Sequence, residues 1–389
     1  MEKKTQAGGE MLAFYSFNGT MERAEIERQV REMAAQGFTG FFVHARAGLE
    51  IPYMQEEWFD HFGLCVELAQ ELGLSVYLYD ENGWPSGFCG GAIPAMGESY
   101  QYKALHFSAG MPDVPPERIL AAYVRGQGAC RRIPLTEITA DSLVAYYMPD
   151  ENYVDVLDRE TVREFIRRTH EVYKQRFGQY FGGVIKGIFT DEPQMFGHRT
   201  TYSFALPDFY AENYGGDVLD ELWKLDKAYF DEAFCDRYMR ALGGLFRQNF
   251  SAQIGGWCAE NGLMLTGHYA GEDGLRGQIL SNGGVMANYI YEQIPGIDHL
   301  GRRLASPVLL KQVTGAAEML QKPHVLSEVF GCAGWDVSFA ELARIWGWHT
   351  VFGVDLPCLH LAAYTIKGRR KRDYPAFFSY QEPWWERTY

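Results

Sequence analysis

The sequence predicts an α/β fold, a (β/α)8 barrel in which eight parallel strands alternate with helices. Its 389 residues are enough for one such barrel with insertions. Short apolar runs alternate with amphipathic segments of helical period, and parallel neighbours need such helical crossovers. The competing open sheet of the dinucleotide-binding type would need a glycine fingerprint after the first strand, and none is present there.

The first three units are regular in the sequence. Each expected helix carries apolar residues at helical spacing and ends at a glycine, Gly37 or Gly73, as helix C-termini commonly do. The expected boundaries are strands 12–17, 39–44 and 74–79, with helices at about 21–36 and 55–72.

Two insertions interrupt the middle of the chain. Residues 85–157 contain short alternating segments separated by Pro and Gly, which predicts a small β-rich subdomain after strand three. A helix at about 159–178 then leads to strand four at 184–189. The second insertion, 194–262, is expected to be mostly helical.

The second half completes the count of eight strands, all within one barrel domain that spans 10–389. The expected elements are strands 263–268, 297–299, 324–327 and 354–361, with helices at about 282–292, 306–321 and 338–349. An eighth helix is missing, because an aromatic tail, 374–389, follows the last strand. Such a tail would leave apolar surface uncovered, so we expect the chain to be a fragment of a longer protein or the product of a truncated gene.

Composition excludes several classes of function. The net charge of −14 argues against a nucleic-acid partner, which requires clustered Lys and Arg, and the basic segment 367–372 is too short to reverse this. Seven cysteines without a CxxC pair are expected to be reduced thiols. No signal peptide and no run of 18 apolar residues is visible, so we expect a cytoplasmic protein without a membrane partner.

Polar and titratable residues follow nearly every predicted strand. In barrels of this type the active site lies at the carboxyl ends of the strands, and a barrel has no structural need for acids there. Taken singly, His44 also fits a core histidine, Asp80 to Gly83 a plain turn, and Asp191 a helix cap. The residues at these ends are Asn18, His44, Arg46, Asp80, Glu81, Asn82, Trp84, Asp191, Glu192, His268, Tyr269, Glu272, Asp273, Asp298, His299, Glu328 and His360.

Glu192, after strand four, and Glu328, after strand seven, are the strongest catalytic candidates. These strands lie on opposite sides of an eight-stranded barrel mouth, so the two carboxyl groups can face each other. Glycoside cleavage needs such a pair, one group giving a proton to the leaving oxygen and the other activating water or attacking the sugar. Asp191 and Asp80 are candidate neighbours that would raise the pKa of the donor. The high aromatic content, 15%, also suits sugar binding.

Several motifs resemble the catalytic barrel of glycoside hydrolase family 106, the α-L-rhamnosidase-type proteins. TDEP and SEVFG resemble the acid and second carboxylate of the wider clan of barrel hydrolases. The more specific segments are YDENGWPSG (79–87), HYAGED (268–273), IPGIDHLG (294–301) and KGRRKRDYPAFFSYQEPWW (367–385).

The resemblance implies an inverting hydrolase that removes a terminal sugar, best an α-L-rhamnoside, from plant or microbial glycans. Glu192 would be the proton donor and Glu328 the base-side carboxylate, with Glu272 a competing claimant for the second role. Asp191 would orient Glu192. Calcium near the sugar is implied by the family, although the sequence itself requires no cofactor and identifies no metal ligands. The implied substrate contacts are His44, Asp80, Asn82, Trp84, Asp191, His268, Tyr269 and Trp335.

Three other functions stay open. One is a retaining glycosidase of the β-galactosidase type, since TDEP also fits those barrels. Its two carboxyl groups would be about 5 to 5.5 Å apart, against about 6.5 to 9.5 Å for inversion. A metal-dependent sugar isomerase or aldolase would instead gather His268, Glu272, Asp298 and His299 around one ion. The third is a sugar-binding fragment without activity.

Overall fold

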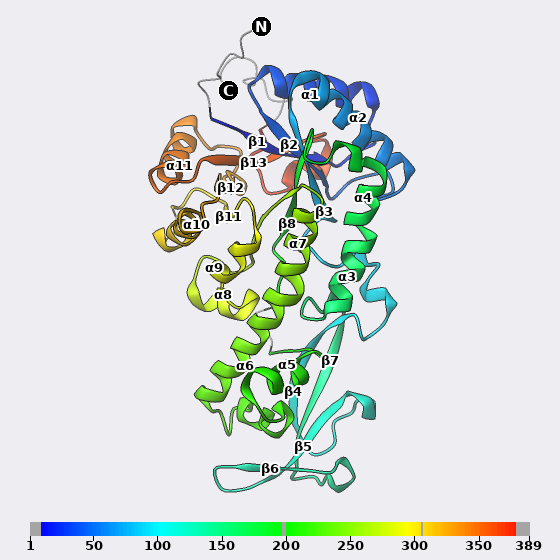
Figure 1. The fold of residues 1–389 in the computed structure, drawn as a ribbon, viewed down its shortest axis with the longest axis vertical. Helices are drawn as coiled ribbons and strands as arrows, with labels where there is room; N and C mark the ends of the chain where they lie inside the picture. The colour runs from blue at the N-terminus through cyan, green and yellow to red at the C-terminus, as the bar shows by residue number, and fades with distance from the viewer. Residues whose placement is uncertain (1–8, 197–199, 305, 379–389) are drawn as a thin grey trace.

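The computed structural model describes residues 9–196, 200–304 and 306–378 and shows a parallel barrel with one elongated projection (Figure 1). Eight strands are hydrogen-bonded in the order β10-β8-β3-β2-β1-β13-β12-β11, which is the order of a (β/α)8 barrel. The strands are β1 (Leu12–Phe17), β2 (Gly40–Ala45), β3 (Ser75–Asn82), β8 (Ile185–Asp191), β10 (Met264–His268), β11 (Gly296–His299), β12 (Leu326–Val329) and β13 (Leu356–Ala363).

The barrel closes between β10 and β11. The parallel bridge from Thr266 to Ile294 joins the two edges. Here Gly296 is needed, because a Cβ at this position would lie 2.3 Å from the carbonyl oxygen of Gly267. The predicted fold class is confirmed.

Helices cover the outside of the barrel. They are α1 (Arg23–Ala35), α2 (Glu56–Leu72), α3 (Arg159–Arg168), α4 (His170–Phe177), α7 (Ala252–Glu260), α8 (Leu275–Asn282), α9 (Val285–Asn288), α10 (Pro307–Met319) and α11 (Phe339–Val351). Two expectations differ from the structure. The helix expected at 159–178 is broken at Thr169 into α3 and α4. The one expected at 282–292 is replaced by two short helices, because Gly283 and Gly284 have φ of 76° and 108°.

The two insertions form one module. Strands β4 (Gln101–Ala109), β5 (Ile119–Arg125), β6 (Cys130–Ile133) and β7 (Leu143–Val154) come from the first insertion, and β9 (Thr201–Tyr202) from the second. Together they make an antiparallel sheet in the order β6-β5-β7-β4-β9. Helices α5 (Leu206–Tyr214) and α6 (Glu232–Leu245) belong to the same projection.

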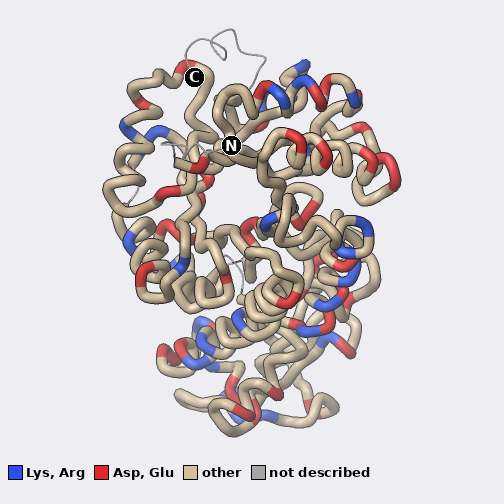
Figure 2. Tube along the Cα trace, turned by 45° about the horizontal axis from the view of Figure 1, so that its top comes forward, with Lys and Arg blue, Asp and Glu red and all other residues tan. Residues whose placement is uncertain are grey.

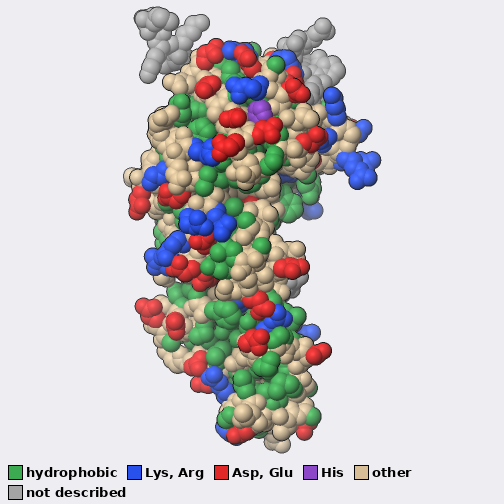
Figure 3. Space-filling model, turned by 90° about the vertical axis from the view of Figure 1, so that its right-hand side faces the viewer, with side chains coloured by type: hydrophobic (Ala, Val, Ile, Leu, Met, Phe, Trp, Pro, Cys, Tyr) green, Lys and Arg blue, Asp and Glu red, His purple; other side chains and the backbone are tan. Residues whose placement is uncertain are grey.

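A buried ion pair of the first insertion also binds a serine of the second. Lys103 of β4 lies 3.3 Å from Asp155, which also accepts a hydrogen bond of 2.8 Å from Ser203. In the space-filling view, hydrophobic side chains are frequent on this module and charged ones are spread over the barrel end (Figure 3). Phe204 and Phe230 are among its exposed apolar residues.

The barrel interior is filled mainly by aromatic rings. Phe14 packs edge-to-face against Phe189, with ring centroids 4.9 Å apart, and Phe42 packs against Tyr77 at 4.7 Å. The tilted view looks onto the ring of strands, and acidic residues are seen on its inner side (Figure 2). This packed floor leaves the carboxyl ends of the strands as the place for a cavity.

Within the described residues, the short 3-10 helix Gly368–Arg372 is the only helix that follows β13. The segment it opens crosses the barrel mouth, where Cys332 and Gly334 donate backbone hydrogen bonds to Tyr374 and Pro375. The last part of the predicted aromatic tail, 379–389, lies outside the described residues. Among the described residues, no helix is both long and apolar enough to cross a membrane.

Candidate active site

A small cavity of ≈ 140 Å³ lies at the carboxyl ends of the barrel strands. Its walls carry four carboxyl groups, two histidines, one arginine and two aromatic rings. The lining residues are Arg46, Trp84, Asp191, Glu192, His268, Asp298, Leu300, Glu328, His360 and Tyr374. This is the convergence that the strand ends predicted, because neighbouring parallel strands end at the same rim.

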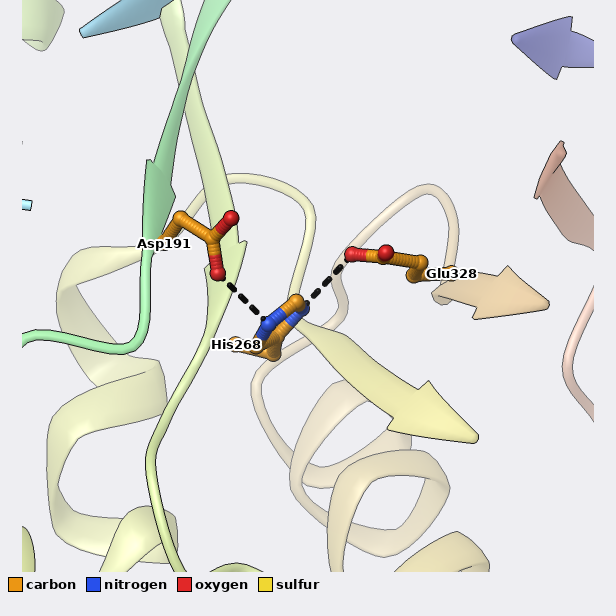
Figure 4. Close-up of side chains that lie close together, drawn as sticks. All are labelled: Asp191, His268 and Glu328. Atoms are coloured by element: carbon orange, nitrogen blue, oxygen red, sulfur yellow. Dashed lines mark ion pairs between the residues drawn. The ribbon is translucent and has the colours of Figure 1, made fainter. Parts of the chain in front are cut away.

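His268 lies between two carboxylates (Figure 4). As the last residue of β10, it places Nε2 2.9 Å from Oδ1 of Asp191, the last residue of β8. Its Nδ1 lies 3.6 Å from Oε2 of Glu328 on β12. All three side chains are buried, so the interaction between their charges is strong.

Asp191 and His268 form a charged pair. Burial alone would raise the pKa of Asp191, but the charge and hydrogen bond of His268, with a further bond from Tyr79, lower it. Burial alone would lower the pKa of His268, but Asp191 raises it well above its ordinary value. We therefore describe Asp191 as ionised and His268 as protonated.

Glu192 lies directly beyond β8, with a left-handed φ of 45°. Its backbone N–H donates to the carbonyl oxygen of His268 at 3.2 Å, which fixes the turn. One carboxylate oxygen of Glu192, one nitrogen of His268 and one oxygen of Asp298 all lie within 4.8 Å of one another. Burial raises the pKa of Glu192, and Asp191 and Asp273 add to this effect. A carboxyl group of this kind can carry a proton at higher pH than an exposed one.

Glu328 and Asp298 are also buried carboxyl groups with raised pKa values. Burial and the neighbouring Asp298 raise the pKa of Glu328 well above its ordinary value, against the opposing effects of His268 and Arg46. Burial raises the pKa of Asp298 to about 7. The cavity thus has more carboxyl groups than nearby cations can hold ionised, and some of them must be protonated near neutral pH.

A hydrogen-bond network behind the cavity holds Asp191. Ser86 accepts a hydrogen bond of 2.8 Å from the Asp191 N–H and donates one of 2.5 Å to Asp80. The Tyr79 hydroxyl donates to Asp191. Asp80 therefore supports the site from behind, through Ser86, and is not among the residues that line the cavity.

Tyr374 and Leu300 line the cavity without having been predicted. Arg46, Asp298 and His360 also line it; they were expected at strand ends but had no role in the predicted glycosidase site. Arg46 makes two hydrogen bonds to Asp373, of 2.8 and 3.1 Å, and this pair places Tyr374 at the cavity wall. Arg46 and Asp373 are 327 residues apart in the chain. Only the position of Arg46 after a strand, and the charged segment before Tyr374, gave any signal of them.

The predicted site residues fall into three groups. Glu192, Glu328, Trp84, Asp191 and His268 line the cavity. His44, Asp80, Tyr269 and Glu272 are buried but are not lining residues. Asn82 and Trp335 are exposed and lie outside the lining set as well.

The position of His44 and Glu272 has a physical reason. His44 stacks on Tyr79 with ring centroids 3.6 Å apart, inside the barrel. The Glu272 carboxylate instead accepts a hydrogen bond of 2.5 Å from the backbone N–H of Asp298.

In the part of the chain that the structure describes, two groups of side chains come close enough to hold a metal ion: Asp191, His268 and Glu328, and Glu192, His268 and Asp298. Calcium prefers six to eight oxygen ligands, whereas each group here contains a histidine that Asp191 holds protonated. The donor set therefore fits calcium poorly. Glu272 and His299 are in neither group, so the four ligands expected for an isomerase do not meet among the described residues.

Another buried acid, Glu292, yields a prediction about stability. Burial raises the pKa of Glu292 to about 8, against an ordinary unfolded value of about 4.3. A raised folded pKa means that its contribution to stability is present below about pH 4.3 and is lost as pH rises through 8. At pH 8.5, Glu292→Gln is therefore expected to be more stable than wild type by about 2 kcal/mol or more in free energy of unfolding, and so to unfold at a higher temperature. The gain should shrink at pH 5. An equal difference at both pH values in thermal unfolding would contradict this.

Comparisons with known proteins support the fold. No family model and no curated protein matches the sequence. A rhamnosidase from Novosphingobium sp. PP1Y superposes with a TM-score of 0.69 at 13% identity, over 97% of this chain and 57% of that one. A β-galactosidase from the psychrophilic Marinomonas ef1 gives 0.57 at 12%, over 95% and 56%. The catalytic domain of a β-amylase from Paenibacillus polymyxa gives 0.53 at 9%, over 91% and 93%. The chain thus spans little more than half of the first two proteins, and at these identities it shares their barrel fold.

Proposed function

We propose that the protein is a glycoside hydrolase that removes a terminal sugar from plant or microbial glycans. The substrate that we favour is an α-L-rhamnoside. The observation that carries the proposal is the pair Glu192 and Glu328 on the walls of one small cavity. The folds of the rhamnosidase and the β-galactosidase support it, as do the sequence motifs around both carboxyl groups.

The cavity size favours a terminal sugar. At ≈ 140 Å³ the cavity is smaller than the typical ligand pocket of about 300–1,000 Å³, which favours a single sugar ring over a longer chain. Trp84 and Tyr374 offer aromatic faces to such a ring. We therefore propose exo-cleavage, with the remaining glycan outside the cavity.

In the proposed reaction, Glu192 protonates the glycosidic oxygen and Glu328 activates the attacking water. The raised pKa of Glu192 keeps the donor loaded, and the charged pair of Asp191 and His268 holds the local geometry. Burial also raises the pKa of Glu328, so a reversed assignment of the two roles fits the same cavity. The leaving-group test in the Discussion separates the two assignments.

A retaining glycosidase of the β-galactosidase type is the second candidate, and the superposition on the Marinomonas enzyme favours it. In that reaction the second carboxylate would attack the sugar directly. The isomerase or aldolase alternative loses its support, because its four expected ligands do not converge among the described residues.

A screen of aryl glycosides tests the proposal. The purified protein is incubated with 4-nitrophenyl α-L-rhamnoside, galactosides, fucoside and arabinoside, each with and without EDTA. We expect release of nitrophenol from the rhamnoside, with little effect of EDTA because the donor set fits calcium poorly. Loss of activity with EDTA, restored by calcium, would instead support the calcium that the resemblance implies. No hydrolysis of any glycoside would overturn the proposal.

A further inference from the structure

The loop 82–90, which begins at the last residue of β3, brings Trp84 to the cavity. Trp84 is 47% exposed and lines the cavity together with Asp191 and Glu192. A ring on an exposed loop can act as a fixed wall only if other contacts hold the loop in place. If the loop were free, ordering it would cost free energy each time a ligand binds. The structure shows how this loop is held.

The Glu81 carboxylate accepts hydrogen bonds from backbone N–H groups of the loop. It is fully buried, and its two oxygens accept four hydrogen bonds from the loop. Oε1 accepts from the N–H groups of Asn82 at 2.8 Å and Gly90 at 2.6 Å. Oε2 accepts from those of Gly87 at 3.2 Å and Cys89 at 2.7 Å. The donors lie at both ends of the loop, so one side chain closes it.

The shape of the loop depends on this contact. Gly87, Cys89 and Gly90 all have left-handed φ values, of 124°, 52° and 61°, which turn their N–H groups toward one point. Positive φ at a non-glycine residue such as Cys89 is held only when the surroundings determine it. The Glu81 carboxylate supplies that determination. Burial raises the pKa of Glu81 to about 7, while the four N–H donors oppose this and favour the ionised form, whose hydrogen bonds are the strong ones.

A second anchor links the loop to the catalytic strand. The backbone N–H of Ser86 donates to the carbonyl oxygen of Asp191 at 2.7 Å, and Ser86 Oγ accepts from the Asp191 N–H at 2.8 Å. Trp84 thus lies between two fixed points, the Glu81 carboxylate and the end of β8. The Ser86 anchor fixes one position, whereas Glu81 fixes the shape of the whole loop.

We infer that Glu81 is a positioning residue whose carboxylate holds loop 82–90 so that Trp84 forms a fixed wall of the sugar-binding cavity. The inference rests on the proposed function for the nature of the ligand. The holding of the loop itself depends only on the hydrogen bonds. Because Glu81 is buried behind the loop and does not line the cavity, its loss should weaken substrate binding more than the chemical step.

Glu81→Gln and Glu81→Asp test this in the full chain. The glutamine has one acceptor oxygen and turns an NH₂ group toward the N–H donors, whereas the aspartate keeps the charge on a shorter side chain. Glu98→Gln is the control, because Glu98 lies on the same connection between β3 and β4 but pairs with Arg118. We expect Glu81→Gln to speed hydrogen exchange of the amides in 82–90 by about tenfold or more, Glu81→Asp by less, and the control by none.

Kinetics on the cleaved glycoside provide the second measurement. Glu81→Gln is expected to raise KM about tenfold with a smaller change in kcat. Because both residues act through one wall, Glu81→Gln added to Trp84→Ala should raise KM little further. Fully additive effects would overturn the inference.

The two claims fail in different ways. If the wild type cleaves no glycoside but Glu81→Gln still frees the loop, the proposed function fails and the loop assignment stands. If amide exchange in 82–90 is unchanged in a folded Glu81→Gln, the inference is wrong whatever the activity. Should Glu81→Gln fail to fold, Glu81→Asp carries the same comparison, and unchanged exchange and KM there would overturn it.

Discussion

Glu192→Gln is expected to lower kcat on an alkyl or sugar rhamnoside by about 10³-fold, the middle of the range for loss of a general acid. The glutamine has no proton to give, while its size keeps the cavity wall. A 4-nitrophenyl leaving group needs little protonation, so the decrease in kcat on a 4-nitrophenyl rhamnoside should be clearly smaller. Steady-state rates on the two kinds of substrate measure this difference.

Glu328→Gln separates the two roles. A base-side carboxylate acts on the water and not on the leaving group. The kcat of this variant is therefore expected to fall to a similar extent on both substrates. The opposite pattern, with the larger leaving-group dependence in Glu328→Gln, would assign the proton to Glu328. Full activity in either variant removes that residue from the mechanism, and Glu98→Gln serves as the control for the substitution itself.

His268→Ala is expected to have the largest effect on stability. The substitution removes the cation between Asp191 and Glu328, so these buried carboxyl groups lose their charged partner. Breaking a buried pair in this way costs about 3–5 kcal/mol. Because the folded pKa of His268 is raised, its contribution to stability is fully present below its unfolded pKa of about 6.5. That contribution is lost as pH rises through the folded pKa. Thermal unfolding should therefore show a larger deficit at pH 6 than at pH 10.

His324→Ala is the matched control for this change. His324 also pairs with a carboxylate, Asp355, at 2.9 Å, but both side chains are more than a third exposed. Exposed pairs contribute about 0–1 kcal/mol, so this variant should unfold close to wild type. Equal deficits in the two variants would contradict the account of His268 as the central buried cation.

The position of the site was predictable because strand periodicity is a local signal. Once Asp191, His268 and Glu328 are placed at strand ends, the barrel itself brings them together. The direction of each side chain was harder to predict. At the end of β3, Glu81 is buried and Asn82 is exposed, whereas the predicted substrate contact was Asn82.

Long-range contacts left little trace in the sequence. The bond from Arg46 to Asp373 spans the chain, and Tyr374 reaches the cavity only through it. Likewise, β9 joins β4 across the two insertions, with Lys103 opposite Tyr202, although its two residues carry no strand pattern. Such pairings are decided by the closed fold and not by local propensity.

NMR of the first sugar released tests the central claim most directly. Wild-type protein is mixed with an α-L-rhamnoside, and the anomeric proton of the new free sugar is followed before mutarotation. The account predicts β-L-rhamnose as the first product, formed by inversion, and no product with Glu192→Gln on a substrate with a poor leaving group. First release of the α anomer would contradict inversion and favour the retaining alternative. Equal release by Glu192→Gln and wild type would contradict catalysis at this cavity.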